Sequence, residues 1–115
     1  MEMWQARSIQ NYIVLNFYSK IRAEDLAEVA QLSRSSFHRA FKASFGYTPS
    51  QYVIRMRIAR AQRLMTMSRD PLRTIAAECG FVNQSDFKCH FRNVVGQRPV
   101  DWRARQPSSH SRTFV

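Results

Sequence analysis

Apolar residues in this chain recur every three to four positions rather than at every second position, a spacing typical of α-helices. Ile9, Ile13 and Phe17 predict a first helix. A short second helix is expected from Glu24 to about Ala30, with acidic residues in its first turn, where the helix dipole favours them. Because only three Gly and four Pro interrupt the pattern, we predict an all-α chain of about seven helices.

A third helix is predicted to begin after Ser33, whose hydroxyl suits the N-cap position. Phe37 marks its buried face, and Gly46 is expected to end it in the left-handed conformation. At 100° per residue, four further side chains fall within about 80° of Phe37 and are expected to face inward: Ala40, Phe41, Ser44 and Phe45.

A long helix is predicted to start at Thr48-Pro49, a capping hydroxyl followed by proline, and to continue to about Met67. It carries two apolar stripes on roughly opposite sides. The first holds Ile54, Ile58, Ala61 and Met65, and the second holds Tyr52, Met56 and Ala59. A helix that is apolar on two sides is expected to connect two packed subdomains.

The remaining helices repeat the same signals. Asp70-Pro71 predicts the start of a short helix through Cys79, and Gly80 supplies the turn. Asn83 is expected to cap the next helix, with Asp86 completing a reciprocal cap. Gly96 is then expected to close that helix, and Pro99 to open a last one around Trp102.

One segment occurs twice along the chain. At an offset of 50 the positions Phe37, Phe41, Lys42, Gly46, Pro49 and Tyr52 recur as Phe87, Phe91, Arg92, Gly96, Pro99 and Trp102. Further upstream the offset is 49, where Leu26, Ala27, Ala30 and Leu32 become Ile75, Ala76, Cys79 and Phe81. Each copy reads as a short helix, a tight turn and a longer helix, which is the layout of a helix-turn-helix unit.

The repeat divides the chain into four segments. We predict a first helix-turn-helix subdomain at 8–47, a linker helix at 48–67 and a second subdomain at 68–106. The polar, aperiodic segment 107–115 is expected to be a disordered tail.

The charge balance then points to a polyanionic partner. The net charge is +10, and 15 of the 18 basic residues are arginine. Nucleic acid is the first candidate and an anionic membrane surface the second. Arginine favours nucleic acid, because its planar guanidinium suits phosphates and guanine edges.

Several classes of function find no support in the sequence. It contains no run of 18 apolar residues and no signal-peptide layout, so we expect a cytoplasmic protein. Cys79 and Cys89 form neither a metal-ligand spacing nor a disulfide framework. No nucleophile–base pair, carboxylate pair or phosphate-binding loop is present, so we predict no enzyme activity, no cofactor and no metal.

Helix geometry selects the residues that would contact DNA. In the first copy Ser35, His38 and Arg39 lie on the outward side of the N-terminal half of the second helix, the part that reaches base edges. Arg39 is the strongest candidate, because a bidentate arginine–guanine contact discriminates by about 1–3 kcal/mol. Lys42 lies further along and is assigned to a phosphate, as is Arg34.

In the second copy the corresponding base-contacting candidates are Gln84, Ser85, Lys88 and Cys89, with Arg92 assigned to a phosphate. Asp86 is open to two roles, capping the helix or accepting a hydrogen bond from cytosine. His90 is expected to pack at the buried edge. Cys89 is expected to face outward, where a redox-sensing thiolate is a weaker alternative.

The linker sets the spacing of the two candidate reading helices. About 18 helical residues span roughly 27 Å, so with the loops the two helices could enter major grooves about one DNA turn, near 34 Å, apart. A helix-turn-helix protein-interaction module and a cationic membrane-surface protein remain the alternatives. The second would need a helix with a single apolar face and basic flanks.

These residues resemble the DNA-binding domain of the AraC/XylS transcription regulators. The run from Ser33 to Lys42, with Gly46, Pro49 and Tyr52, is similar to its first half. Arg57, Ala61 and Leu64-Met65 resemble its linker helix. The stretch from Ile75 to Phe81, with Phe87, Phe91, Gly96 and Pro99, resembles its second-half signature.

The resemblance implies a bacterial regulator, commonly an activator, that inserts two helices into adjacent major grooves and contacts RNA polymerase. Family members often carry an additional sensor or dimerisation domain, and some stand alone. The family usually has arginine at the position of Cys89, so the second helix is expected to bind differently from the first. Arg98, at the position of the capping Thr48, is a lesser departure. Because the outward residues differ between the copies, an asymmetric DNA site is expected.

Overall fold

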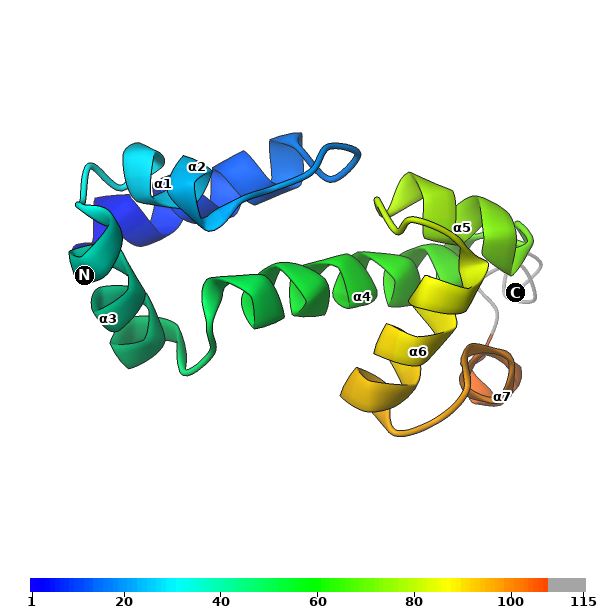
Figure 1. Cartoon of the computed structure of the whole chain (residues 1–115). Coiled ribbons are helices and arrows are strands. Elements are labelled where there is room, and N and C mark those ends of the chain that lie inside the picture. Colours follow the sequence, from blue (N-terminus) through cyan, green and yellow to red (C-terminus); the bar gives the residue numbers. More distant parts are fainter. Residues whose placement is uncertain (108–115) are drawn as a thin grey trace, which may run out of the picture. The chain divides into compact units, whose positions relative to one another are not determined.

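The computed structural model describes residues 1–107, and within them it contains seven α-helices and no strand (Figure 1). The helices are α1 Met3–Leu15, α2 Ala23–Val29, α3 Arg34–Phe45, α4 Pro49–Met67, α5 Leu72–Glu78, α6 Gln84–Val95 and α7 Pro99–Arg105. The predicted all-α fold with two helix-turn-helix subdomains is confirmed. The predicted disordered tail lies outside the described residues from 108 onward.

The chain forms two compact units, Met1–Met56 and Arg57–Val115, here called the first and the second unit. The division falls within α4, so the N-terminal part of this helix belongs to the first unit and the rest to the second. Helix α1 begins at Met3, ahead of residue 8.

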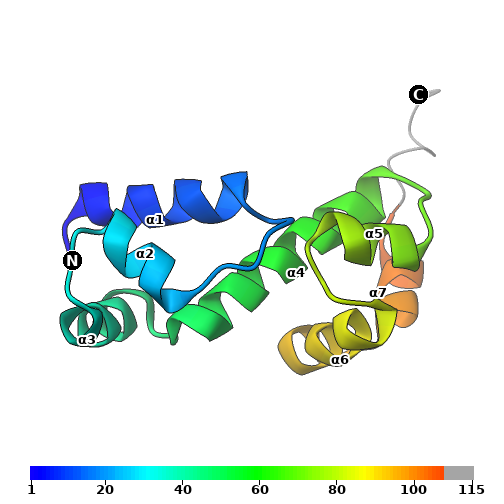
Figure 2. The same cartoon turned by 45° about the horizontal axis from the view of Figure 1, so that its top comes forward.

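The first unit packs α1, α2, α3 and the start of α4 around one core, with α1 and α2 side by side in both views (Figures 1 and 2). The buried apolar residues are Ile9, Ile13, Phe17, Leu26, Ala27, Ala30, Phe37, Phe41 and Val53. Gln5 is also buried, and its Nε2 donates to the carbonyl of Ala30 at 2.9 Å. Since a buried amide needs a partner, this bond ties α1 to the end of α2.

The second unit repeats that arrangement with the end of α4, α5, α6 and α7. Its buried apolar residues are Ile58, Ala61, Met65, Ile75, Ala76, Cys79, Phe81, Phe87 and Phe91. Phe37 and Phe41 are fully buried, as are their counterparts Phe87 and Phe91. The repeated phenylalanines therefore form the centre of each core.

The two apolar stripes predicted for α4 are only partly correct. Ile58, Ala61 and Met65 are buried as expected, but Ala59 is exposed. The first core instead receives Val53, which the sequence pattern missed. Because the first unit ends at Met56, a side chain at position 59 lies beyond the part of α4 that this core covers.

The helix ends form largely as the sequence predicts. Ser33 Oγ accepts a hydrogen bond from the amide of Ser36 at the start of α3. Thr48 and Gln51 form a reciprocal capping box at the start of α4, with bonds of 3.1 and 3.2 Å. Gly46 ends α3 in the left-handed region with φ 78°, as predicted.

The start predicted at Asp70-Pro71 is wrong by one residue. Helix α5 begins at Leu72, and Pro71 occupies the N-cap position without a side-chain hydrogen bond. Asp70 belongs to the preceding turn, because its amide donates to Ser68 Oγ and its carbonyl accepts from Arg103.

The tight turn of each helix-turn-helix closes with the same backbone bond. The amide of Leu32 donates to the carbonyl of Ala27, and at an offset of 49 that of Phe81 donates to Ala76, both at 3.0 Å. This geometry requires a left-handed residue. The second unit supplies Gly80 with φ 86°, whereas the first supplies Gln31 with φ 58°.

We therefore expect Gln31→Gly to stabilise the first unit by about 0.5–1 kcal/mol, because glycine adopts this conformation without the steric cost of a Cβ atom. Urea unfolding followed by circular dichroism measures the change. The reverse exchange, Gly80→Gln, is expected to destabilise the second unit by about 1 kcal/mol. A loss of stability in Gln31→Gly would contradict the assignment of strain to this turn.

Candidate nucleic-acid interface

The outward side of α3 presents the residues that the sequence selected. Ser35, His38, Arg39 and Lys42 are all exposed, while Phe37 is buried on the opposite side. Ser44, which was expected to face inward, is exposed. Ser44 lies in the last turn of α3, two residues before Gly46. In this turn the buried side of the helix is narrower than helical angles alone suggest.

Aromatic contacts hold α3 in place. Phe41 stacks on Phe45 with ring centroids 4.4 Å apart and meets Tyr52 of α4 edge-on at 5.4 Å. In the second unit Phe91 meets Trp102 of α7 in the same way at 5.8 Å. Such edge-to-face pairs favour one ring orientation, so each outward helix is fixed against the helix that follows it.

Arg34 lies at the start of α3, and its guanidinium pairs with Glu24 of α2 at 2.8 Å. Both side chains are about half exposed or more, so the pair contributes little to stability. Arg34 therefore lies where its contact with Glu24 competes with any contact to a phosphate.

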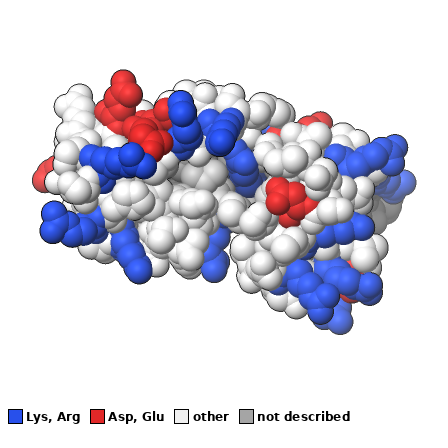
Figure 3. All heavy atoms as spheres, viewed as in Figure 1, with Lys and Arg blue, Asp and Glu red and all other residues white. Residues whose placement is uncertain are grey.

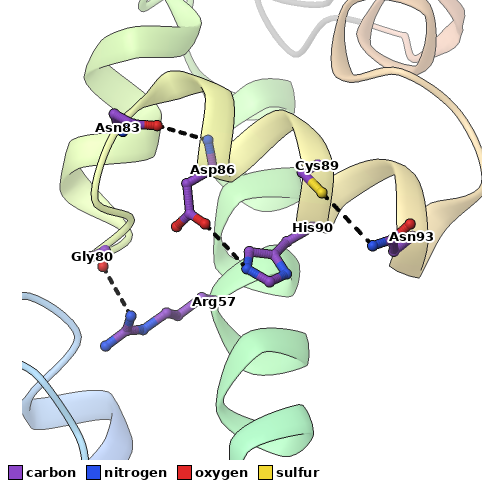
Figure 4. A network of polar contacts seen from close by, with 7 residues as sticks. All are labelled: Arg57, Gly80, Asn83, Asp86, Cys89, His90 and Asn93. Atoms are coloured by element: carbon purple, nitrogen blue, oxygen red, sulfur yellow. Dashed lines mark hydrogen bonds and ion pairs between the residues drawn. The ribbon is translucent and has the colours of Figure 1, made fainter.

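In α6 the predicted residues also lie on the outside. Ser85, Lys88, Cys89 and Arg92 are exposed, and Gln84 is half-buried at the first position of the helix. Cys89 occupies the position of Arg39, and its Sγ lies 3.9 Å from Asn93 Nδ2 (Figure 4). The outward faces of α3 and α6 thus match in position and differ in chemistry.

Asn83 caps α6 by accepting a hydrogen bond from the amide of Asp86 at 2.8 Å, as predicted. The reciprocal bond predicted for the Asp86 side chain does not form. Its carboxylate instead lies 3.3 Å from Nε2 of His90, one turn along the helix (Figure 4). His90 also stacks on Phe81, so it is the half-buried packing residue that the sequence indicated.

Behind α6, the turn of the second unit is held by Arg57 of α4, whose Nη1 donates to the carbonyl of Gly80 at 2.9 Å (Figure 4). Burial lowers the pKa of this guanidinium, and the charge of Asp86 opposes that effect. Burial also raises the pKa of Cys79 to about 11, so its thiol is neutral near pH 7. Cys79 therefore serves as a small core residue, as does Ala30 in the first unit.

Two surface hollows adjoin the outward helices. One, of about 440 Å³, lies beside α3 and is lined by His38, Arg39, Lys42, Ala43, Thr48 and Pro49. The other, of about 610 Å³, lies at the end of α6 and against α7 and is lined by Arg92, Gly96, Gln97, Arg98, Asp101, Ala104 and Arg105. Sequence patterns had singled out Arg92 but not Arg105, because a hollow between two helices leaves no periodic signal.

Residues 1–107 contain neither a metal site nor a membrane-spanning helix. No cluster of His, Cys, Asp and Glu in this part of the chain could hold a metal ion. None of its helices is both long enough and apolar enough to cross a membrane.

Comparison with known proteins gives consistent results. The family model of the helix-turn-helix domain matches residues 26–105. The probable transcriptional regulator LumQ of Photobacterium leiognathi is 40% identical over 92 residues, which are 80% of this chain and 37% of LumQ. The transcriptional activator RhaS of Pectobacterium carotovorum is 30% identical over 97 residues, which are 84% of this chain and 35% of RhaS. The chain thus spans little more than a third of these curated relatives.

Solved structures show the same fold. The DNA-binding domain of AdpA, a global transcriptional factor crystallised with a target DNA, superposes with a TM-score of 0.82 and 28% identity, covering 99% of this chain and 100% of that one. A transcriptional regulator with an AraC-type DNA-binding domain from Chromobacterium violaceum gives a TM-score of 0.81 and 26% identity, covering 90% and 95%.

Proposed function

Because this chain belongs to the AraC/XylS family of helix-turn-helix transcription regulators, we propose that it recognises a specific site on double-stranded DNA by inserting α3 and α6 into adjacent major grooves. The observation that carries this proposal is the outward face of α3. There Ser35, His38 and Arg39 are exposed on a helix that is fixed from behind by stacked aromatic rings. Exposed polar groups on a rigid helix are what base recognition requires.

The proposed roles divide between bases and backbone. Ser35, His38 and Arg39 on α3, and Gln84, Ser85, Lys88 and Cys89 on α6, are proposed to contact base edges. Arg34, Lys42 and Arg92 are proposed to contact phosphates, which position the helices without carrying sequence information.

The length of α4 supports two contacts by one monomer. This helix has 19 residues and is therefore about 28 Å long at 1.5 Å per residue. We propose that one monomer contacts two major grooves about one DNA turn apart. Because Arg39 corresponds to Cys89 and His38 to Lys88, the two half-sites are expected to differ in sequence.

RhaS is named a transcriptional activator, which supports the inference that this chain also activates transcription. We propose RNA polymerase as the protein that it contacts at the promoter. We further infer that it acts in the bacterial cytoplasm, at the nucleoid when bound to DNA.

Selection of bound sites from random duplexes tests the proposal. We expect an asymmetric motif in two parts about one helical turn apart, and binding to the selected duplex that survives an excess of unrelated DNA. The affinity should fall steeply with salt, since arginine and lysine displace counterions from the phosphates.

Two other results would overturn the proposal. Equal binding to every duplex would indicate a basic protein without base recognition. Preference for vesicles containing anionic lipids over DNA would indicate a membrane-surface protein, and retention of a protein partner without DNA binding would indicate an interaction module.

A further inference from the structure

The two units differ in charge more than their shared fold requires. Residues 1–56 carry seven Lys and Arg against four Asp and Glu, whereas residues 57–115 carry eleven against four. Figure 3 shows basic side chains gathered over α7 in the second unit. The larger share of the net charge of +10 thus lies in the unit whose outward helix has Cys89 where α3 has Arg39.

The repeat explains how the hollow at α7 arises. Two of its lining residues, Gln97 and Ala104, stand where the first unit has Tyr47 and Ile54. Both exchanges replace a bulky side chain with a smaller one. At these two positions the hollow of the second unit is therefore lined by smaller side chains than the first unit has there.

The same exchange changes the surroundings of an arginine. In the first unit, the guanidinium of Arg55 lies over the ring of Tyr47, 4.3 Å from its centroid. Its counterpart Arg105 has Gln97 in place of that ring and lines the hollow. A cation–π contact holds an arginine on its own protein, so Arg105 is more available to an outside anion than Arg55 is.

Arg98 is a further basic residue of the hollow, and the first unit has Thr48 at the matching position. Thr48 and Gln51 cap α4, and the matching residues of the second unit are Arg98 and Asp101. Arg98 Nε donates to Asp101 Oδ2 at 2.7 Å. This bond orients the guanidinium and uses only Nε, which leaves the two Nη groups for another acceptor.

Arg92 joins the hollow to the outward face of α6. It lies in the last turn of this helix, on the side that Ser85, Lys88 and Cys89 share. The hollow therefore begins where the proposed DNA-facing side of α6 ends, and Arg92, Arg98 and Arg105 surround it.

We propose that this arginine hollow seats one phosphodiester group of the DNA backbone beside the groove that α6 enters, so that the second unit adds a phosphate anchor to the base contacts of α6. Guanidinium groups suit this task, because their paired N–H donors match the oxygens of a phosphate. The inference rests on the proposed DNA-binding function. It assigns to Arg98 and Arg105 a contact that has no equivalent in the first unit.

The charge-reducing variant Arg105→Ala tests the hollow, and Arg55→Ala is its matched control at the same place in the repeat. We expect Arg105→Ala to weaken binding to specific and unrelated duplexes alike, by about threefold to tenfold, and to reduce the slope of log K against log salt by about 0.9. Arg55→Ala should leave that slope unchanged. An unchanged slope in Arg105→Ala, or equal losses in both variants, overturns the proposal.

A second variant keeps the net charge constant. Gln97→Tyr combined with Ala104→Ile restores the side chains of the first unit, and we expect it to reproduce the loss seen in Arg105→Ala. In the opposite direction, Asp101→Asn removes a negative charge and keeps an oxygen for Arg98, so binding should tighten. Circular dichroism melts confirm that each variant is folded. Full affinity in the filled variant would show that the hollow is not used.

The source of the phosphate is tested by neutralising single backbone positions of the selected duplex with methylphosphonate. Neutralising one of these positions should weaken DNA binding by the wild type and leave the DNA affinity of Arg105→Ala unchanged. Inorganic phosphate is the comparison ligand. If micromolar phosphate saturates the shift of the Arg98 Nε–H NMR signal and abolishes DNA binding, the hollow is a site for a small ligand instead. If the wild type selects no DNA sequence at all, the proposed function is wrong. If the wild type selects a sequence and these variants bind DNA as the wild type does, only the proposed phosphate anchor is wrong.

Discussion

Replacing Arg103 with alanine is expected to destabilise the second unit by about 2–4 kcal/mol, because three charge-assisted hydrogen bonds are lost together. Arg103 Nε donates to the carbonyl of Met65, Nη1 to Asp70 and Nη2 to Ser68, at 2.6 to 3.1 Å. These carbonyls lie at the end of α4 and in the turn that follows. The last carbonyls of a helix lack partners within the helix, so a cation placed there satisfies them and complements the helix dipole.

Native-state hydrogen exchange measures this effect separately in each unit. We expect faster exchange of the buried amides around Phe87 and Phe91 in Arg103→Ala, and unchanged exchange around Ile13 and Phe41. Arg103→Lys should recover only part of the loss, because one ammonium group cannot match the geometry of three carbonyls. Arg105→Ala, two residues away and exposed, should stay within about 0.5 kcal/mol of the wild type. Equal stability of Arg103→Ala and Arg105→Ala would refute the structural role.

Much of this fold follows from signals that act within a few residues. The left-handed Gly46 and Gly96, the caps at Ser33 and Asn83, and the buried Phe87 all appear where the sequence predicts them. Each depends on local backbone geometry or on helical spacing, which one sequence contains in full. The repeat strengthens these predictions because most of the signals occur at matching positions in both copies.

The features that the sequence missed depend on what a distant element covers. Helical angles place Ala59 on an apolar stripe and Ser44 on the inward face, yet both side chains are exposed. The sequence predicted Asp70 as a helix cap, but it lies in the preceding turn. There its backbone carbonyl accepts a hydrogen bond from Arg103, which is 33 residues away. Asp86 is a local exception, because the partner of its carboxylate, His90, lies only four residues along the same helix.

The candidate DNA contacts lie between these two cases. Helical angles were sufficient to predict that Arg39 and Cys89 face outward, and both are exposed. Whether an outward side chain meets a base or a phosphate depends on how the helix sits in the groove, which the sequence of one chain does not encode locally. The hollow at Arg105 depends on Tyr47 becoming Gln97, a difference that gains meaning only when the two units are compared in space.

That comparison leads to a prediction about the unequal copies. We expect Arg39→Ala to reduce specific affinity by about 1–3 kcal/mol, or roughly five- to 150-fold, because a bidentate contact to guanine is lost. Sites selected by this variant should lose sequence preference in the half contacted by α3. Cys89→Ala should cost much less, since a thiol is a weak donor and Cys89 already contacts Asn93. Competition binding on the selected duplex measures both.

Cys89→Arg is the matched gain-of-contact variant, because it gives α6 the arginine that α3 has at the same position. We expect it to tighten binding to duplexes with a guanine at one position of the second half-site, and to leave the first half-site preference unchanged. If Cys89→Ala instead costs more than Arg39→Ala, α6 contributes more to base recognition than α3, and the expected order of the two helices is wrong. The proposed phosphate anchor also predicts that Arg39→Ala changes the sequence preference and Arg105→Ala the salt dependence, so an exchange of these two effects would refute it.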